Sequence, residues 1–133
     1  MKKLMFLCLV LALFSMQSYA YTIFEASQDL GSENTYYEYF SSTPSYVSVS
    51  VDAWNSNTIT TAFKDSVNIF AKVQLYRNGS LQRRLSNHGD GSEEHVYHES
   101  WTSVQQGDQL VVTLINNYTS GSGQCWARID YFY

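Results

Sequence analysis

The sequence predicts an all-β protein: a single antiparallel β-sandwich of about eight strands, jelly-roll or immunoglobulin-like, after a cleaved signal peptide. Three observations support this class. Long segments alternate apolar and polar residues with a period of two. The chain is rich in Tyr, Ser, Thr, Val and Asn and has a single proline, Pro44, which is a strand-and-turn composition. No stretch shows the three-and-four spacing of an amphipathic helix.

The first twenty residues have the three-part pattern of an export signal. A positive start, Met1–Lys3, precedes an uncharged apolar run over Leu4–Phe14, and Ser18-Tyr19-Ala20 places small residues where a signal peptidase cleaves. The apolar run is shorter than the ~20 residues of a membrane span. We therefore expect cleavage after Ala20 and a secreted domain over 21–133, which would be periplasmic in a Gram-negative source.

The charge of the mature domain argues against two kinds of partner. The whole chain has a net charge of −4, and loss of Lys2 and Lys3 with the signal makes it −6. Nucleic acid and anionic membranes are bound through basic faces. We expect neither as a partner.

Strands and turns follow one another along the mature chain. The expected strands are 21–26, 36–40, 45–54, 58–63, 66–76, 81–85, 94–101, 109–118 and 124–133. The turn-like segment 28–34 separates the first two. Asn78-Gly79 predicts a tight type I′ hairpin, because both residues tolerate positive φ. Gly107-Asp108 is expected to turn the chain into a core strand.

Strand 45–54 has the clearest alternation. Val47, Val49, Val51 and Ala53 form its apolar face, and Tyr46, Ser48, Ser50, Asp52 and Trp54 form its polar face. The last strand alternates in the same way, with Cys125 in phase with Ala127 and Ile129. Because Cys8 leaves with the signal, Cys125 has no internal disulfide partner. We expect it to be a buried free thiol, the alternative being an intermolecular disulfide.

The surplus of aromatic residues is the feature most suggestive of function. Flat rings stack on the C–H faces of sugars, while amide and acid side chains bond the hydroxyl groups. Secreted, non-enzymatic carbohydrate or glycan binding is therefore the leading hypothesis. The candidate ligand-binding residues are Tyr46, Trp54, Tyr97, Trp101 and Trp126, and Tyr36, Tyr37, Tyr39 and Tyr118 are further candidates for exposure.

A polar cluster over residues 87–99 holds all three histidines. Asp90, Glu93 and Glu94 are candidate oxygen ligands for calcium, with neighbouring glycines that allow a tight loop. A transition-metal site of His88, His95 and His98 is disfavoured, because residues three apart on a strand point to opposite faces. Otherwise this segment is a solvated loop, and no cofactor is required.

Two alternative functions remain. A long C-terminal strand at a sheet edge would be a template for self-association, as in a matrix, coat or fimbrial subunit. A secreted effector or enzyme would use the His/acid cluster at 88–99. We expect no enzyme, because no motif with a catalytic mechanism is present. Asn78 and Asn117 begin N-glycosylation sequons that matter only in a source that glycosylates.

Overall fold

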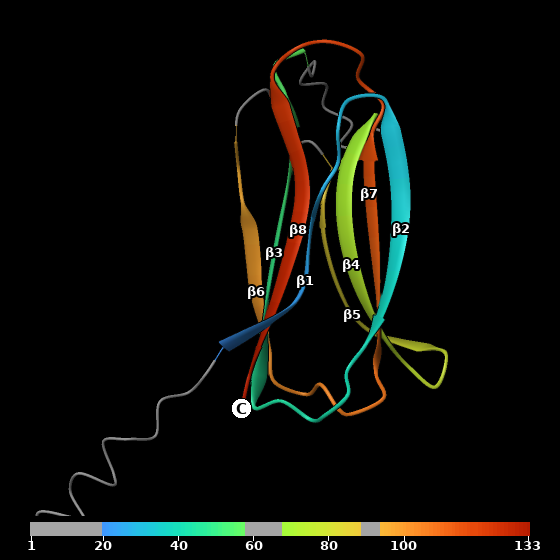
Figure 1. Ribbon diagram of the computed structural model, residues 1–133, viewed down its shortest axis with the longest axis vertical. Coiled ribbons are helices and arrows are strands. Elements are labelled where there is room, and N and C mark those ends of the chain that lie inside the picture. The colour runs from blue at the N-terminus through green and yellow to red at the C-terminus, as the bar shows by residue number, and fades with distance from the viewer. Residues whose placement is uncertain (1–19, 58–67, 89–93) are drawn as a thin grey trace, which may run out of the picture.

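The computed structural model describes residues 20–57, 68–88 and 94–133 (Figure 1). The expected strand at 58–63 lies outside these residues. Eight strands are described: β1 (Ala20–Ser27), β2 (Ser32–Tyr39), β3 (Tyr46–Asn55), β4 (Ile69–Arg77), β5 (Ser80–Asn87), β6 (Tyr97–Trp101), β7 (Gln109–Asn116) and β8 (Gly123–Phe132). Within this part of the chain, no helix has the length and apolar character needed to cross a membrane.

The strands form two antiparallel sheets packed face to face, which confirms the predicted β-sandwich (Figure 1). Sheet A has the order β1-β8-β3-β6, and sheet B has the order β2-β7-β4-β5. Along the chain, most connections pass from one sheet to the other, and only β4 and β5 are consecutive neighbours in one sheet. The first and last strands of the chain, β1 and β8, pair with each other in sheet A although they are about one hundred residues apart in the sequence.

The core lies between the inner faces of the two sheets. The alternating apolar residues of β3, β4, β7 and β8 are buried there, as the period of two predicts. Cys125 is 1% exposed and free, which confirms the buried thiol. Burial in apolar surroundings raises the pKa of this thiol to about 11.

The exposure expected for Trp101 is wrong. Its side chain is 1% exposed, because it pairs with the inward-facing Val47 and therefore lies on the core side of β6. Its indole Nε1 donates a hydrogen bond to Glu99 Oε2 at 2.8 Å, which satisfies the polar atom at the edge of the core. Trp101 is thus a core residue of sheet A.

The expectation that the last strand lies at a sheet edge is also wrong. β8 pairs with β1 over residues 126–132 and with β3 over residues 123–132. Its backbone groups are therefore satisfied on both sides. β8 offers no free edge to another chain, and the C-terminal-strand route to self-association loses its basis.

The predicted turns are confirmed at two places. Asn78 and Gly79 have φ values of 50° and 78° and connect β4 to β5, as the type I′ hairpin requires. Gly107 has φ of 86° and precedes β7. The turn expected over residues 28–34 is shorter, because β2 already begins at Ser32.

Candidate functional site

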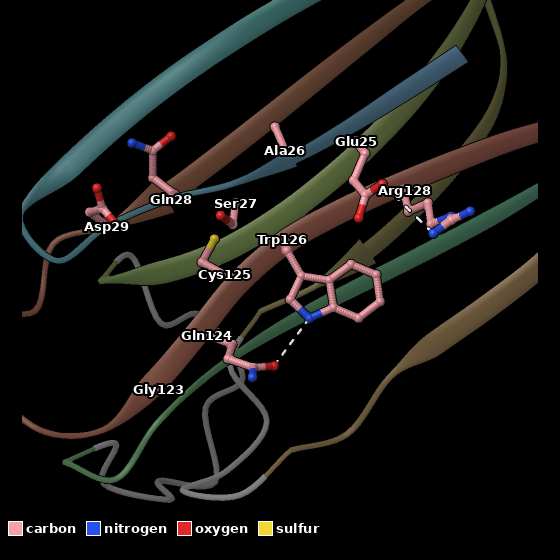
Figure 2. Close-up of a pocket in the computed structure, with 10 residues that line it drawn as sticks. All are labelled: Glu25, Ala26, Ser27, Gln28, Asp29, Gly123, Gln124, Cys125, Trp126 and Arg128. Atoms are coloured by element: carbon pink, nitrogen blue, oxygen red, sulfur yellow. Dashed lines mark hydrogen bonds and ion pairs between the residues drawn. The ribbon is translucent and has the colours of Figure 1, made fainter. Parts of the chain in front are cut away.

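A hollow of about 690 Å³ lies where β1 and its following turn meet β8 (Figure 2). We call it the β1–β8 hollow. One aromatic side chain, two amides and several charged groups line it, so it combines an apolar surface with hydrogen-bonding groups. Its residues are Glu25, Ala26, Ser27, Gln28, Asp29, Gly123, Gln124, Cys125, Trp126 and Arg128.

Trp126 supplies the aromatic surface. It lies between the buried residues Cys125 and Ala127, so strand alternation turns its side chain to the outer face of sheet A. Figure 2 shows its indole on the opposite side of β8 from the Cys125 thiol. Indole Nε1 donates a hydrogen bond to Gln124 Oε1 at 3.2 Å. This bond holds the ring in a half-buried position with part of its surface open.

A charged network borders the indole. Arg128 Nε donates to Asp130 Oδ2 at 2.8 Å, and its Nη1 lies 3.7 Å from Glu25 Oε2. Thr22 Oγ1 donates to Asp130 Oδ1 at 2.6 Å. Burial alone would raise the pKa of Asp130, but the hydrogen bonds from Arg128 and Thr22 outweigh it and lower that pKa. The acid is therefore held in its ionised form.

Gln28 fixes the opposite rim. Its backbone N donates to Cys125 O at 2.7 Å, which extends the contact between the two strands beyond the end of β1. Its side-chain Oε1 accepts from Asn34 Nδ2 at 3.1 Å and from Tyr36 Oη at 3.5 Å. Asp29, at the start of the turn, is exposed. Amide and carboxylate groups therefore lie at one rim, and the indole lies along the other.

Two buried polar groups, the Asp52 carboxylate and the Trp54 indole nitrogen, lie next to Trp126 on the same face. Asp52 is paired with Trp126 across the sheet and is fully buried. Its Oδ1 accepts from His95 N at 3.3 Å, whereas Asp52 Oδ2 and Trp54 Nε1 have no partner among the described residues. Burial raises the pKa of Asp52, which outweighs the bond from His95. Unsatisfied buried groups of this kind are uncommon and often mark functional positions.

Of the other aromatic candidates, Trp54 is paired with Gln124 and lies beside the hollow, whereas Tyr46 and Tyr97 lie apart from it. Tyr46 is 37% exposed on the outer face of sheet A and stacks on Phe132, with ring centroids 4.3 Å apart. Tyr46 and Trp54 are eight positions apart along β3, which corresponds to about 26 Å. One sugar ring therefore cannot contact both. Tyr97 is half-buried and packs against the core.

The described residues do not test the calcium hypothesis. Asp90 and Glu93 lie outside the described residues, and Glu94 is exposed. Residues 20–57, 68–88 and 94–133 contain no group of three side chains arranged to hold a metal ion. His98 bonds Ser50 on the outer face of sheet A, whereas His88 packs on Phe70 of sheet B. These two histidines are therefore on different sheets.

Sequence reasoning identified Trp126 but missed the polar groups around it. Glu25, Gln28 and Asp29 come from the start of the chain, and Gln124 and Arg128 come from its end. Only the pairing of β1 with β8 brings them together. The alternation of each strand indicates which side chains point outward, but it does not indicate which strands are neighbours. The outward phase of Glu25, Gln124 and Arg128 was the only available signal.

Several solved structures are distantly similar to this chain. One solved structure is the CBM36-1 domain of a multidomain xylanase from the hindgut metagenome of Trinervitermes trinervoides, with 13% identity, a TM-score of 0.38, and coverage of 86% of this chain and 96% of that chain. Another is a carbohydrate-binding module, CBM36, in complex with calcium and xylotriose, with 17% identity, a TM-score of 0.37, and coverage of 86% and 99%. These values are too low to argue for a ligand. No family model and no curated protein matches the sequence.

Proposed function

We propose that this chain is a secreted, non-catalytic carbohydrate-binding domain and that the β1–β8 hollow is its binding site. The observation that carries the proposal is the half-buried indole of Trp126, fixed by Gln124 beside an open hollow lined with amide and carboxylate groups. An indole face matches the apolar C–H face of a sugar ring. The polar rim supplies donors and acceptors for the hydroxyl groups.

The character of the carboxylates favours binding over glycoside hydrolysis. A glycosidase needs one carboxyl group that keeps its proton near neutral pH. Burial raises the pKa of Asp52, but its side chain is fully buried and does not line the hollow. Asp130 is the reverse case, because Arg128 and Thr22 stabilise its ionised form. Glu25 also faces the Arg128 guanidinium. These groups are suited to accepting hydrogen bonds from a neutral sugar and to holding Arg128 in place.

The test is binding to a panel of neutral polysaccharides and oligosaccharides by the wild type and by Trp126→Ala. Covering roughly 80 Å² of indole surface at ~25 cal/mol/Å² contributes about 2 kcal/mol. This loss corresponds to an approximately 30-fold rise in Kd. Trp126→Phe should keep part of the affinity, since it retains a ring. Tyr46→Ala, an aromatic truncation on the same sheet but apart from the hollow, is the control and should bind as the wild type does. Equal binding by Trp126→Ala, or no binding to any neutral glycan, would contradict the proposal.

Secretion has a separate test. Tyr21 of β1 pairs with Tyr131 of β8, and the centroids of their stacked rings are 5.5 Å apart. A chain that begins at Tyr21 therefore keeps the first strand of the sandwich except for Ala20. Mass spectrometry of the exported protein should therefore find Tyr21 at the N-terminus. A product that retains the apolar segment would refute the signal peptide.

A further inference from the structure

The outer face of sheet B carries a flat aromatic and amide surface away from the hollow. Tyr37 and Tyr39, both on β2, are each 61% exposed. Gln109 Nε2 donates to Tyr39 Oη at 2.8 Å, which ties the ring to β7. The backbone register then continues from Tyr37 through Val111 and Gln74 to Arg84. With strands about 4.8 Å apart, this row spans about 14 Å across the sheet.

The unpaired positive charge of the described protein gathers on the same sheet. Five basic residues are described, and two of them are in ion pairs: Arg77 with Asp108, and Arg128 with Asp130. The other three, Lys72, Arg83 and Arg84, lie on β4 and β5 and have no ion pair among the described residues. A basic region in a chain of net charge −4 is not explained by composition.

Two of these cations point to the outer face. Lys72 lies between the buried residues Ala71 and Val73, and its Nζ is 5.2 Å from the centroid of the neighbouring Phe70 ring. Arg84 is paired with the outward-facing Gln74. Arg83 is paired with the buried Leu75 and is therefore in the opposite phase of the strand. Arg84 is thus at the opposite end of the row from Tyr37, and Lys72 lies beside the row, two residues from Gln74 on β4.

We propose that the outer face of sheet B is a second binding surface and that it takes an acidic polysaccharide. Tyr37 and Tyr39 stack on sugar rings, Gln74 and Gln109 bond hydroxyl groups, and Lys72 and Arg84 pair with carboxylate or sulfate groups. Charge complementarity favours an anionic chain, because the acids described on the strands of this sheet, Glu33 and Glu38, both lie on β2, at the opposite edge from Arg84. The exposed rings select a carbohydrate over a simple polyanion. The proposal extends the binding role to a second ligand class and does not depend on the hollow.

Affinity electrophoresis and calorimetry of the secreted chain test this assignment. The probes are polygalacturonate, which carries carboxylates, dextran sulfate, which carries sulfates, and neutral dextran. We expect binding to an anionic glycan, weakening as salt rises, and no binding to dextran. Arg84→Glu should weaken binding at least tenfold, whereas Arg83→Glu, with the same change in net charge on the opposite phase, should change it less than threefold. Preference between the first two probes identifies the anionic group.

Aromatic variants separate sugar recognition from simple ion exchange. Tyr37→Ala should also weaken binding at least tenfold, and Trp126→Ala should leave it unchanged. Binding to polyglutamate as strong as to the anionic glycans, or equal losses in Arg83→Glu and Arg84→Glu, would overturn the proposal. If Trp126→Ala loses only the binding of neutral glycans, the proposal for the outer face of sheet B stands. Failure of either proposed site is thus distinguishable from failure of the other.

Discussion

Replacement of Asp108 by alanine tests a buried carboxylate that forms a two-point contact with an arginine. Its carboxylate is almost fully buried and accepts three hydrogen bonds: from Arg77 Nε and Nη2, both at 2.8 Å, and from Gln105 N at 2.9 Å. Arg77 Nη2 also donates to Ser103 O at 2.7 Å. This network joins the end of β4 to the turn that leads into β7. Asp108→Ala removes the carboxylate that accepts the hydrogen bonds from Arg77 and Gln105.

The expected cost follows from burial. Breaking a buried ion pair by removing one partner costs about 3–5 kcal/mol. The Arg77 side chain keeps 29% of its exposure and can be rehydrated, so the lower end applies, about 3 kcal/mol. Total stabilities of domains are only about 5–15 kcal/mol. For a domain of this size, the Tm should fall by roughly 12 °C.

Asp130→Ala is the matched control. Asp130 also pairs with an arginine through its carboxylate, but its side chain is 18% exposed, against 2% for Asp108. Exposed pairs contribute about 0–1 kcal/mol. Urea unfolding followed by tryptophan fluorescence should therefore separate the two variants by at least about 2 kcal/mol. Equal destabilisation, or a cost below about 1 kcal/mol for Asp108→Ala, would refute the reasoning from burial.

The acid dependence of the same residue is fixed in sign. Burial raises the pKa of Asp108, but the bonds from Arg77 and Gln105 outweigh it and lower that pKa below 3.8. Its contribution to stability is therefore present above pH 3.8 and is lost as the pH falls through the lower folded value. Asp108→Ala should show a shallower loss of stability in acid than the wild type.

Three further predictions concern single residues. Burial raises the pKa of Asp52, so ionisation destabilises the fold as the pH rises above 3.8, and Asp52→Asn should gain stability relative to the wild type at pH 7 but not at pH 3; a loss at pH 7 would contradict this sign. Cys125 should resist thiol reagents at pH 8 in the folded protein and react on unfolding, since burial raises its pKa to about 11; rapid native labelling would show that it is accessible. Gly123→Ala should destabilise more than Gly31→Ala in the same urea assay, because an added Cβ would lie 2.8 Å from Asn55 Cα and even closer to Trp54 O, whereas at Gly31 the space is open and only the positive φ of 75° opposes a side chain; a smaller cost at Gly123 would contradict this.

The sequence predicted well what depends on neighbours along the chain. The alternation of β3 identified Val47, Val49 and Val51 as core residues, and Asn78-Gly79 located a hairpin, because both signals are local. Trp101 was misplaced because its strand has only five residues, with an irregular polar pattern. A short strand gives too few positions to fix which phase faces the core.

What the sequence could not supply was the order of strands. The C-terminal strand looked like an edge because it ends the chain, yet β1 returns to cover it. The same pairing creates the β1–β8 hollow from residues such as Gln28 and Gln124. Strand order depends on long-range packing of the two inner faces, to which every alternating strand contributes in the same way. Functional residues gathered by that order are therefore not visible in local patterns.

The two proposed surfaces face away from each other across the core. Trp126 lies on the outer face of sheet A, and Arg84 lies on the outer face of sheet B. A core about 10 Å thick separates the two sheets. Trp126 and Arg84 have no contact partner in common, so the effects of their substitutions on binding should be independent. The double variant Trp126→Ala/Arg84→Glu should lose each glycan to the same extent as the corresponding single variant, measured by calorimetry with each probe in turn. A larger loss of either ligand in the double variant would mean that the two faces communicate through the core, and the separation argued from the sheet register would be untenable.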